Sequence, residues 1–208
     1  IETDQSPIGK ILEAKKKEIL KEIEICEQIG TEKITEKSLN LYGRPEKNVI
    51  EKAKKELLEV EFEEETNNLD AKKVKRILEK RLTQYGLKWR VKLKDNLADV
   101  ATAGKNGLVF LRKNIIVSKQ RVMTMLRHEI DCHVLKAENG KMQKYEIFNR
   151  GFPNYLQTEE GQAIHMVNQL DINTRKIYFP QLRVILVDLA LKKSFSEISR
   201  RADRKSVV

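Results

Sequence analysis

Two of the chain's 3 histidines lie in one short segment, His-Glu-Ile-Asp-Cys-His, which runs from His128 to His133. Zinc prefers imidazole nitrogens and carboxylate oxygens, and a catalytic zinc site keeps one position open for water. The two histidines are five residues apart, which on a regular helix separates their side chains by about 140°. One ion can therefore bind both only if the helix widens to a π-type turn, or if it ends before His133 and the chain bends back.

A third ligand is expected from a later helix, which Thr158 can cap and in which Glu159 and Glu160 are the candidates. Glu160 precedes Ile164 by four residues and so lies on the predicted inward stripe, where a carboxylate is costly unless it is paired or metal-bound. Glu159 lies nearer the edge and is interpreted as an ordinary acid at a helix N-terminus, favoured by the helix dipole. That interpretation also stays open for Glu160, which is the predicted ligand.

These segments resemble the microtubule-associated tyrosine carboxypeptidases and their bacterial relatives of unassigned function. That family carries a His-Glu-x-x-x-His segment, which residues 128–133 match, followed by Thr-Glu-Glu-Gly, which residues 158–161 match. The family's upstream Leu-Tyr-Gly-x-Pro turn is matched by residues 41–45. The resemblance covers roughly residues 38–170, and the pairing of two zinc motifs makes it specific.

The resemblance implies a zinc metallopeptidase with a gluzincin-like site and one zinc ion. Carried over residue by residue, it implies that His128, His133 and Glu160 bind the metal and that Glu129 is the general base. It also implies a carboxypeptidase that removes a C-terminal residue, of the tyrosine type, from a protein or peptide tail. The implied partner is an acidic, tubulin-like tail.

Three residues depart from the family's usual pattern. Asp131 and Cys132 replace a Gly-Thr pair between the ligands, and Gln162 replaces a leucine. Cys132 adds a soft donor beside the site, although a small packed side chain is the simpler interpretation. Fewer residues follow Glu160 than is usual in the family. These departures motivate an alternative from another class, a non-catalytic zinc-binding interaction module derived from such an enzyme.

Four further residues are candidates for supporting roles. Tyr155 could donate to the oxyanion, although a core or loop tyrosine is the simpler interpretation. Arg150 and Arg175 are the nearest candidates for binding a substrate's terminal carboxylate, to which the guanidinium fork is suited. His165 could support Glu160 or the oxyanion, with a hydrogen-bonded structural histidine as the alternative.

The elements that would position this site follow from the hydrophobic pattern. Apolar residues recur at helical spacing from residue 8 to about 84, with breaks near residues 30, 41–45 and 67–68. Residues 88–94 alternate strictly, which predicts a strand with Trp89, Val91 and Leu93 facing inward and four cations facing outward. Residues 108–111 and 115–117 predict further short strands, the first preceded by a hairpin turn at residues 106–107.

Helical spacing resumes over residues 122–134, and the segment 139–157 is irregular. A last long helix is expected over much of 173–200, broken or kinked at Pro180. We therefore predict an α+β fold that is mostly helical, with a small antiparallel sheet beside a zincin-like active-site helix. Residues 1–85 would form a helical region packed on a metallopeptidase core of residues 86–208, or the two would form one continuous domain.

Composition narrows the possible partners. Lys and Arg number 41 and Asp and Glu 31, so the formal net charge of +10 favours acidic partners. The charge is interleaved with Glu and joins no aromatic platform, so a nucleic-acid-binding helical protein is the least favoured hypothesis. No apolar run approaches the ~18 residues of a membrane-spanning helix. Two cysteines and a polar, acidic start give no support for secretion, and we expect a cytoplasmic protein.

Overall fold

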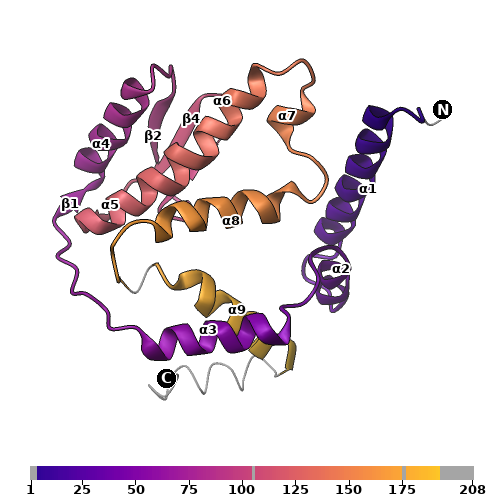
Figure 1. Cartoon of the computed structure of the whole chain (residues 1–208), viewed down its shortest axis with the longest axis horizontal. Coiled ribbons are helices and arrows are strands. Elements are labelled where there is room, and N and C mark those ends of the chain that lie inside the picture. The colour runs from indigo at the N-terminus through magenta and orange to yellow at the C-terminus, as the bar shows by residue number, and fades with distance from the viewer. Residues whose placement is uncertain (1–3, 105, 175–176, 193–208) are drawn as a thin grey trace. The chain divides into compact units, whose positions relative to one another are not determined.

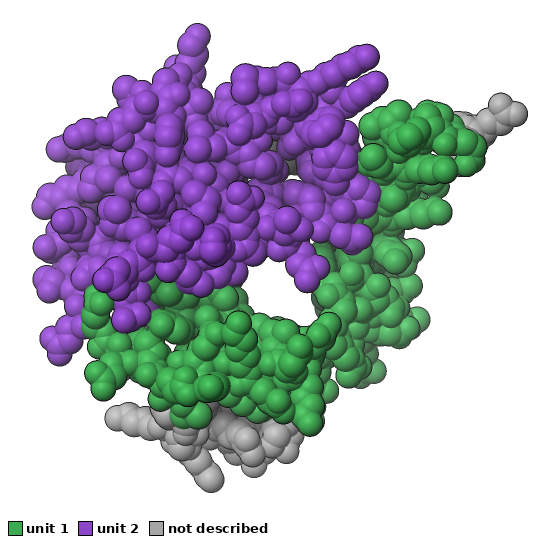
Figure 2. Space-filling view, in the orientation of Figure 1, with its two compact units in different colours: residues 1–63, 175–208 green, residues 64–174 purple. Residues whose placement is uncertain are grey.

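The computed structural model of the chain describes residues 4–104, 106–174 and 177–192. These residues form two compact units, one of Glu64–Thr174 and one that combines the residues up to Glu63 with those from 177 onward (Figure 2). Compact units are not necessarily domains that fold separately, so the predicted division at residue 85 stays a prediction. Among the helices that the structure describes, none has the length and apolar composition required to cross a bilayer.

The unit that contains the N-terminal residues is built from two helix pairs, α1 (Pro7–Glu27) with α2 (Lys33–Tyr42) and α3 (Lys47–Glu59) with α9 (Phe179–Lys192). Gln181 of α9 donates from Nε2 to Glu56 Oε2 of α3 at 2.8 Å. The predicted break at Pro180 is wrong, because Pro180 is the second residue of α9, where its missing N–H costs no helical hydrogen bond. Residues 173–174 and 177–178 of the predicted last helix are not helical, and residues 175–176 and 193–200 lie outside the described residues.

The unit Glu64–Thr174 contains the predicted site and carries all the strands that the structure describes (Figure 1). Its elements before the site are β1 (Leu69–Asp70), α4 (Ala71–Gln84), β2 (Arg90–Lys94), β3 (Ala101–Ala103), β4 (Leu108–Arg112), β5 (Ile116–Val117) and α5 (Lys119–Met125). The site elements and those after them are the π-helix η1 (Leu126–Val134), α6 (Leu135–Lys141), α7 (Ile147–Arg150) and α8 (Tyr155–Asn168).

The main sheet has the strand order β2-β4-β3 and is mixed. β3, which was not predicted as a strand, forms an antiparallel hairpin with β4 around the predicted turn, whose residues Asn106 and Gly107 have positive φ angles of 60° and 75°. β2 pairs with β4 in parallel, from Arg90 opposite Leu108 to Lys94 opposite Arg112. The parallel pair was not predicted, because β2 reaches β4 through a long connection that includes β3 itself. A second, two-stranded sheet joins β1 to β5.

The predicted orientation of the strand at residues 88–94 is confirmed. Trp89 and Val91 are buried and Leu93 packs against the core, while all four cations of the segment are exposed. The core beneath the sheet contains Val74, Leu78 and Leu82, which recur every four residues and so share one face of α4. The mostly helical α+β fold predicted from the sequence is therefore confirmed.

One long helical rod crosses this core. α5, η1 and α6 follow one another without an intervening loop, and Figure 1 shows them as one continuous helix with α8 alongside. Ser118 starts the rod by accepting the Arg121 N–H at its side-chain oxygen. Ile130 and Val134 of η1 are completely buried against the core. The histidine segment therefore lies on an element that is packed against the core.

Candidate metal centre

The helix that carries the two histidines is widened between them. Residues Leu126–Val134 form a π-helix, in which hydrogen bonds join residues five apart. Residues at this spacing then share one face, and the rings of His128 and His133 lie with their centroids 4.8 Å apart. The π-type turn predicted from the five-residue spacing is confirmed, and the alternative in which the helix ends before His133 is wrong.

Asp131, which the sequence presented only as a departure, anchors the widened turn to α4. Its side chain is 1% exposed, and its Oδ2 accepts from Arg81 Nη2 of α4 at 3.1 Å and from Arg127 Nη1 at 3.3 Å. Its Oδ1 accepts from the Tyr85 hydroxyl at 3.0 Å. Burial raises the pKa of Tyr85, and the Asp131 carboxylate raises it further. A buried carboxylate with three donors is satisfied, so Asp131 is compatible with an intact site.

Cys132 packs against α8 as a neutral thiol. Its side chain is buried, and its Sγ lies 3.8 Å from the Glu159 backbone carbonyl oxygen. Burial, followed by the nearby charges of Glu159 and Glu160, raises the pKa of the thiol to about 11. Metals bind the thiolate rather than the thiol. The interpretation of Cys132 as a small packed side chain is therefore favoured over that of a soft donor.

The helix that carries the acidic pair begins earlier than predicted. α8 begins at Tyr155, after Asn154 in the left-handed conformation with φ 57°, so Thr158 lies inside the helix and does not cap it. Glu159 and Glu160 lie beyond the first turn, where the helix dipole gives little stabilisation. The interpretation of these two residues as N-terminal helix acids is therefore wrong.

Glu160 reaches both histidines. Its Oε2 lies 3.5 Å from His128 Nε2, and its Oε1 lies 3.6 Å from His133 Nε2. One ligand atom from each of the three residues lies within 4.8 Å of the other two. Zinc bound tetrahedrally at 2.0–2.1 Å holds its ligand atoms roughly 3.4 Å apart, so the donor types and their spacing fit a zinc ion.

The relative burial of the two glutamates is the reverse of the prediction. The Glu160 side chain is 45% exposed, whereas the Glu159 side chain is only 10% exposed. The inward stripe was assigned through Ile164, whereas the buried residues of α8 are Ala163 and Val167, and Glu159 precedes Ala163 by four residues. Glu160 therefore contacts the histidines from the solvent-exposed side, and Glu159 contacts His133 from the buried side.

Glu159 is a residue of the site that sequence reasoning missed. Its Oε1 lies 2.7 Å from His133 Nδ1, and its Oε2 accepts from Lys136 Nζ at 3.1 Å. Histidines that bind metals usually donate their second N–H to a carboxylate, which fixes the ring. A carboxylate next in sequence to a predicted ligand was the signal that could have identified it.

In the metal-free chain, His133 and Glu159 each stabilise the charged form of the other. Burial alone would lower the pKa of His133, but the hydrogen bond to Glu159 and the charges of Glu129 and Glu160 raise it overall. Burial would likewise raise the pKa of Glu159, but hydrogen bonds from His133 and Lys136 lower it overall. The Nδ1–H of His133 is therefore directed to Glu159, which leaves Nε2 on the side of Glu160.

Glu129 lies beside the cluster and contacts the sheet. Its Oε2 accepts the backbone N–H of Ala103 in β3 at 2.7 Å. Burial raises the pKa of the Glu129 carboxyl, although the neighbouring His128 and the Ala103 hydrogen bond act in the opposite direction. A positioned carboxylate with a raised pKa accepts a proton more readily than an ordinary glutamate does.

Tyr155 is linked to Glu159 through Lys136. Lys136 Nζ, which binds Glu159, lies 4.8 Å from the centre of the Tyr155 ring. The ring covers Gly151, whose φ of 100° favours glycine and where an added Cβ would collide with the ring. This packing fixes the ring near the site, and the role of oxyanion donor stays a prediction.

The remaining predicted site residues are not brought to the cluster by any contact that the described residues show. Arg150 is exposed and binds Glu146 Oε1 through Nη2 at 2.9 Å. His165 is exposed and pairs with Gln169 Nε2 at 3.3 Å, and it lies five residues beyond Glu160, on a different face of α8. Among the described residues, no contact therefore supports the predicted role of His165 beside Glu160. Arg175 lies outside the described residues.

Comparisons with known proteins give one result that covers nearly the whole chain. No curated protein and no solved structure matches. A family model described as microtubule-associated tyrosine carboxypeptidase matches residues 1–203, which include both histidines and both glutamates of the cluster. The chain therefore belongs to the microtubule-associated tyrosine carboxypeptidase family.

Proposed function

We propose that the chain is a zinc-dependent metallocarboxypeptidase that removes a C-terminal residue of the tyrosine type from an acidic protein tail. The observation that carries the proposal is the convergence of His128, His133 and Glu160 across a π-helical turn. A π-helix is rare and is frequently found at functional sites. Family membership supports the same reaction class.

When bound, zinc would supply a Lewis acid that polarises the scissile carbonyl and lowers the pKa of water from 15.7 to about 7. Glu129 would take the proton of the attacking water at its carboxylate and pass it to the nitrogen of the leaving residue. The Ala103 N–H holds Glu129 Oε2 in place for both transfers. Such positioned proton transfer typically contributes about 10²–10⁴-fold to the rate.

The residues around the ligands have separate tasks in this proposal. Glu159, held by Lys136, would keep the His133 ring in the tautomer and orientation that present Nε2. Tyr155 would donate to the oxyanion, and Arg175 would bind the terminal carboxylate of the tail. Arg150 would bind that carboxylate only after leaving Glu146.

The partner in this proposal is a tubulin-like acidic tail in the cytoplasm. The formal net charge of +10 supports an acidic substrate, because the summed field of the protein attracts such a chain before it docks. The family description supports a tubulin tail, since tubulin is the protein of which microtubules consist.

The decisive experiment measures zinc content and hydrolysis together. Purified chain is expected to hold one zinc ion and to release tyrosine from an acidic peptide that ends in tyrosine. Glu129→Gln should keep the zinc and lose about 10²–10⁴-fold in kcat. Glu51→Gln, which removes one carboxylate from an exposed ion pair with Lys47, is the matched control and should retain both zinc and activity.

The same experiment tests the non-catalytic alternative. The replacements at Asp131, Cys132 and Gln162 motivated it, but Asp131 is fully hydrogen-bonded and Cys132 is buried. A chain that binds zinc but hydrolyses none of a panel of peptides with varied C-terminal residues would favour the interaction module. Equal activity in the Glu129→Gln chain would contradict the assigned base.

A further inference from the structure

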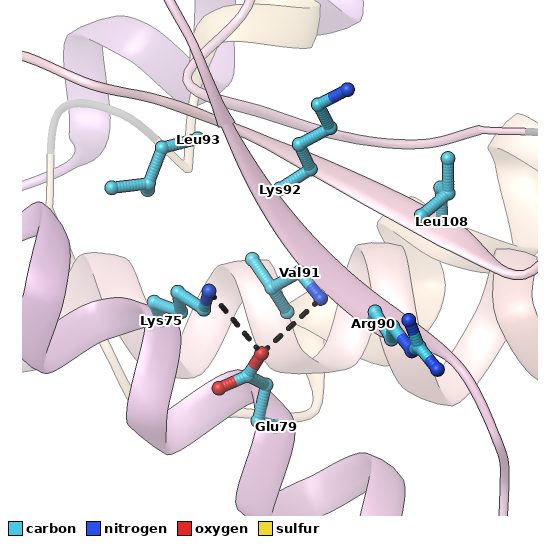
Figure 3. Close-up of a pocket in the computed structure, with 7 residues that line it drawn as sticks. All are labelled: Lys75, Glu79, Arg90, Val91, Lys92, Leu93 and Leu108. Carbon is cyan, nitrogen blue, oxygen red and sulfur yellow. Dashed lines mark hydrogen bonds and ion pairs between the residues drawn. The ribbon is translucent and has the colours of Figure 1, made fainter.

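We propose that the groove between α4 and β2 is a second binding site, which takes an extended acidic peptide segment. The groove has a volume of about 480 Å³ (Figure 3). It is lined by Lys75, Glu79, Arg90, Val91, Lys92, Leu93 and Leu108. This lining combines three cations with an apolar floor and the outer edge of a strand.

The strand edge supplies places for a peptide backbone. β2 is an edge strand of the main sheet, and its Arg90 N–H and Lys94 carbonyl point toward β4, bonding Gly107 and Lys113. Because alternate residues of a strand direct their amide groups to opposite sides, the N–H and C=O of Val91 point away from β4. An edge strand with outward-facing amides is a template onto which an extended peptide can add as a further strand.

The groove already holds one carboxylate. Glu79 of α4 points at β2, where its Oε1 lies 3.4 Å from the Val91 N and 3.6 Å from Lys75 Nζ, as Figure 3 shows. The hydrogen bond to Val91 is long and therefore weak. The position of the Glu79 carboxylate shows that such a group fits between the Lys75 ammonium and the edge of β2. An incoming acidic group would therefore displace Glu79.

The cations of β2 favour an acidic occupant. Arg90 and Lys92 are exposed, and within the part of the chain that the structure describes neither forms an ion pair. They alternate with the apolar residues of the strand, at the same two-residue repeat as the side chains of an added strand. Acidic side chains on such a strand would therefore meet a cation at every second position.

A peptide fits this groove better than a nucleic acid does. Single-stranded nucleic acids bind where aromatic side chains stack on the bases, and the lining of the groove contains no aromatic residue. Outward amides in a row match a peptide backbone instead. The occupant we assign is thus an extended polypeptide rich in Asp or Glu.

This site is separate from the metal centre. β3, whose Ala103 N–H binds Glu129, lies at the opposite edge of the sheet from β2. Binding in the groove therefore does not depend on the proposed hydrolysis.

The test uses fluorescence anisotropy of the full chain with a labelled hexaglutamate peptide. The double variant Arg90→Gln, Lys92→Gln should weaken binding by about five- to thirtyfold at low salt. The double variant Lys119→Gln, Lys144→Gln removes the same charge at exposed positions outside the groove and should change binding by less than about twofold. Equal effects of the two double variants would overturn the proposal, because binding would then follow net charge alone.

Two further measurements test the geometry. Glu79→Gln removes the resident carboxylate and should tighten hexaglutamate binding by about two- to fivefold. A hexaglutamate methylated at alternate backbone nitrogens keeps its charge but loses its donors, and it should bind about tenfold more weakly than the unmethylated peptide. Equal affinity for the two peptides would contradict strand addition.

The competing occupants give distinct results. An oligouridine that binds more tightly than hexaglutamate, and that depends on Arg90 and Lys92, would reassign the groove to nucleic acid. Self-association that the Arg90→Gln, Lys92→Gln variant abolishes, without any binding of hexaglutamate, would reassign it to a second copy of the chain. Either result would overturn the acidic-peptide assignment while leaving the proposed hydrolysis untouched.

Discussion

His133 has two ring nitrogens with different partners, and this difference organises the candidate site. Nδ1 lies 2.7 Å from Glu159, whereas Nε2 lies 3.6 Å from Glu160. Glu159 is in turn bound by Lys136. One histidine is thus held from behind by a buried acid and faces a partly exposed one, which is the arrangement of a metal ligand and its support.

Replacing Glu159 should weaken metal binding without removing a ligand. Glu159→Gln removes the charge that holds His133 Nδ1–H, and we expect the zinc Kd to rise by about 10–100-fold. Competition with a fluorescent chelator measures the change. Glu146→Gln is the control for loss of a carboxylate, and an unchanged Kd in both variants would remove Glu159 from the site.

Acid should release the metal through His133. The ion pair with Glu159 and the neighbouring acids raise the pKa of this imidazole in the metal-free chain, and a metal displaces its proton. Below that pKa, affinity should fall by roughly tenfold for each pH unit from this residue alone, whereas above it affinity should level off. Zinc titrations between pH 5 and about pH 8 test whether zinc affinity falls as the pH is lowered. A zinc affinity that stays constant over this range would contradict protonation of a ligand.

The residues of the cluster were predictable from their types and spacing, but the support of His133 was not. His128, His133 and Glu160 do lie together, although the reason given for Glu160, an inward face, is wrong. Which glutamate is buried depends on which face of α8 meets the core. That face is centred on Ala163 and Val167, whereas the apolar pattern also placed Ile164 on it.

At the scale of the element, the π-helix is the feature that makes the site possible. A regular helix would direct His128 and His133 about 140° apart, and η1 brings their rings within 4.8 Å. π-turns are rare because their geometry is less favourable than that of an α-helix, so other contacts must stabilise them. The hydrogen bonds of Asp131 to Arg81 and Tyr85 tie the widened turn to α4 and supply such contacts.

Asp131→Ala should therefore lower both stability and metal affinity. The variant leaves Arg81 and Tyr85 without their buried acceptor, and we expect a loss of about 1–3 kcal/mol in the free energy of unfolding. Urea denaturation of the metal-free chain measures it. Asp95→Ala, which breaks the exposed pair with Lys113, should cost less than about 1 kcal/mol. Equal losses in the two variants would show that Asp131 does not stabilise the turn.

The sheet shows the limit of sequence patterns at this scale. The alternation at residues 88–94 predicted the strand and the burial of Val91, because alternation reports directly on which side chains meet the core. The parallel partner of β2 was not predictable, since pairing depends on the path of residues 95–107. β1 has only two residues, too few for any alternation to be visible.

At the scale of the whole molecule, the cluster links two elements that are distant along the chain. His128 and His133 come from η1 and Glu160 from α8, with α6 and α7 between them. All three residues belong to the unit Glu64–Thr174. A ligand that binds only the folded state stabilises it, so zinc should act as a clamp between η1 and α8.

We expect this clamp to be visible in thermal unfolding. Zinc at about 100 times its Kd should add about 2.7 kcal/mol to the stability of the folded chain. For a chain of this length, that corresponds to a Tm higher by roughly 5–10 °C than in the presence of a chelator. Glu160→Gln removes the only ligand from α8 and should abolish most of the shift, whereas Glu146→Gln should retain it.

Hydrogen exchange adds a readout specific to each unit, because protection on adding zinc should rise in η1 and α8 but not in α1 or α3. An equal Tm shift in the Glu160→Gln chain would mean that zinc binds elsewhere, and the proposed centre would then be wrong.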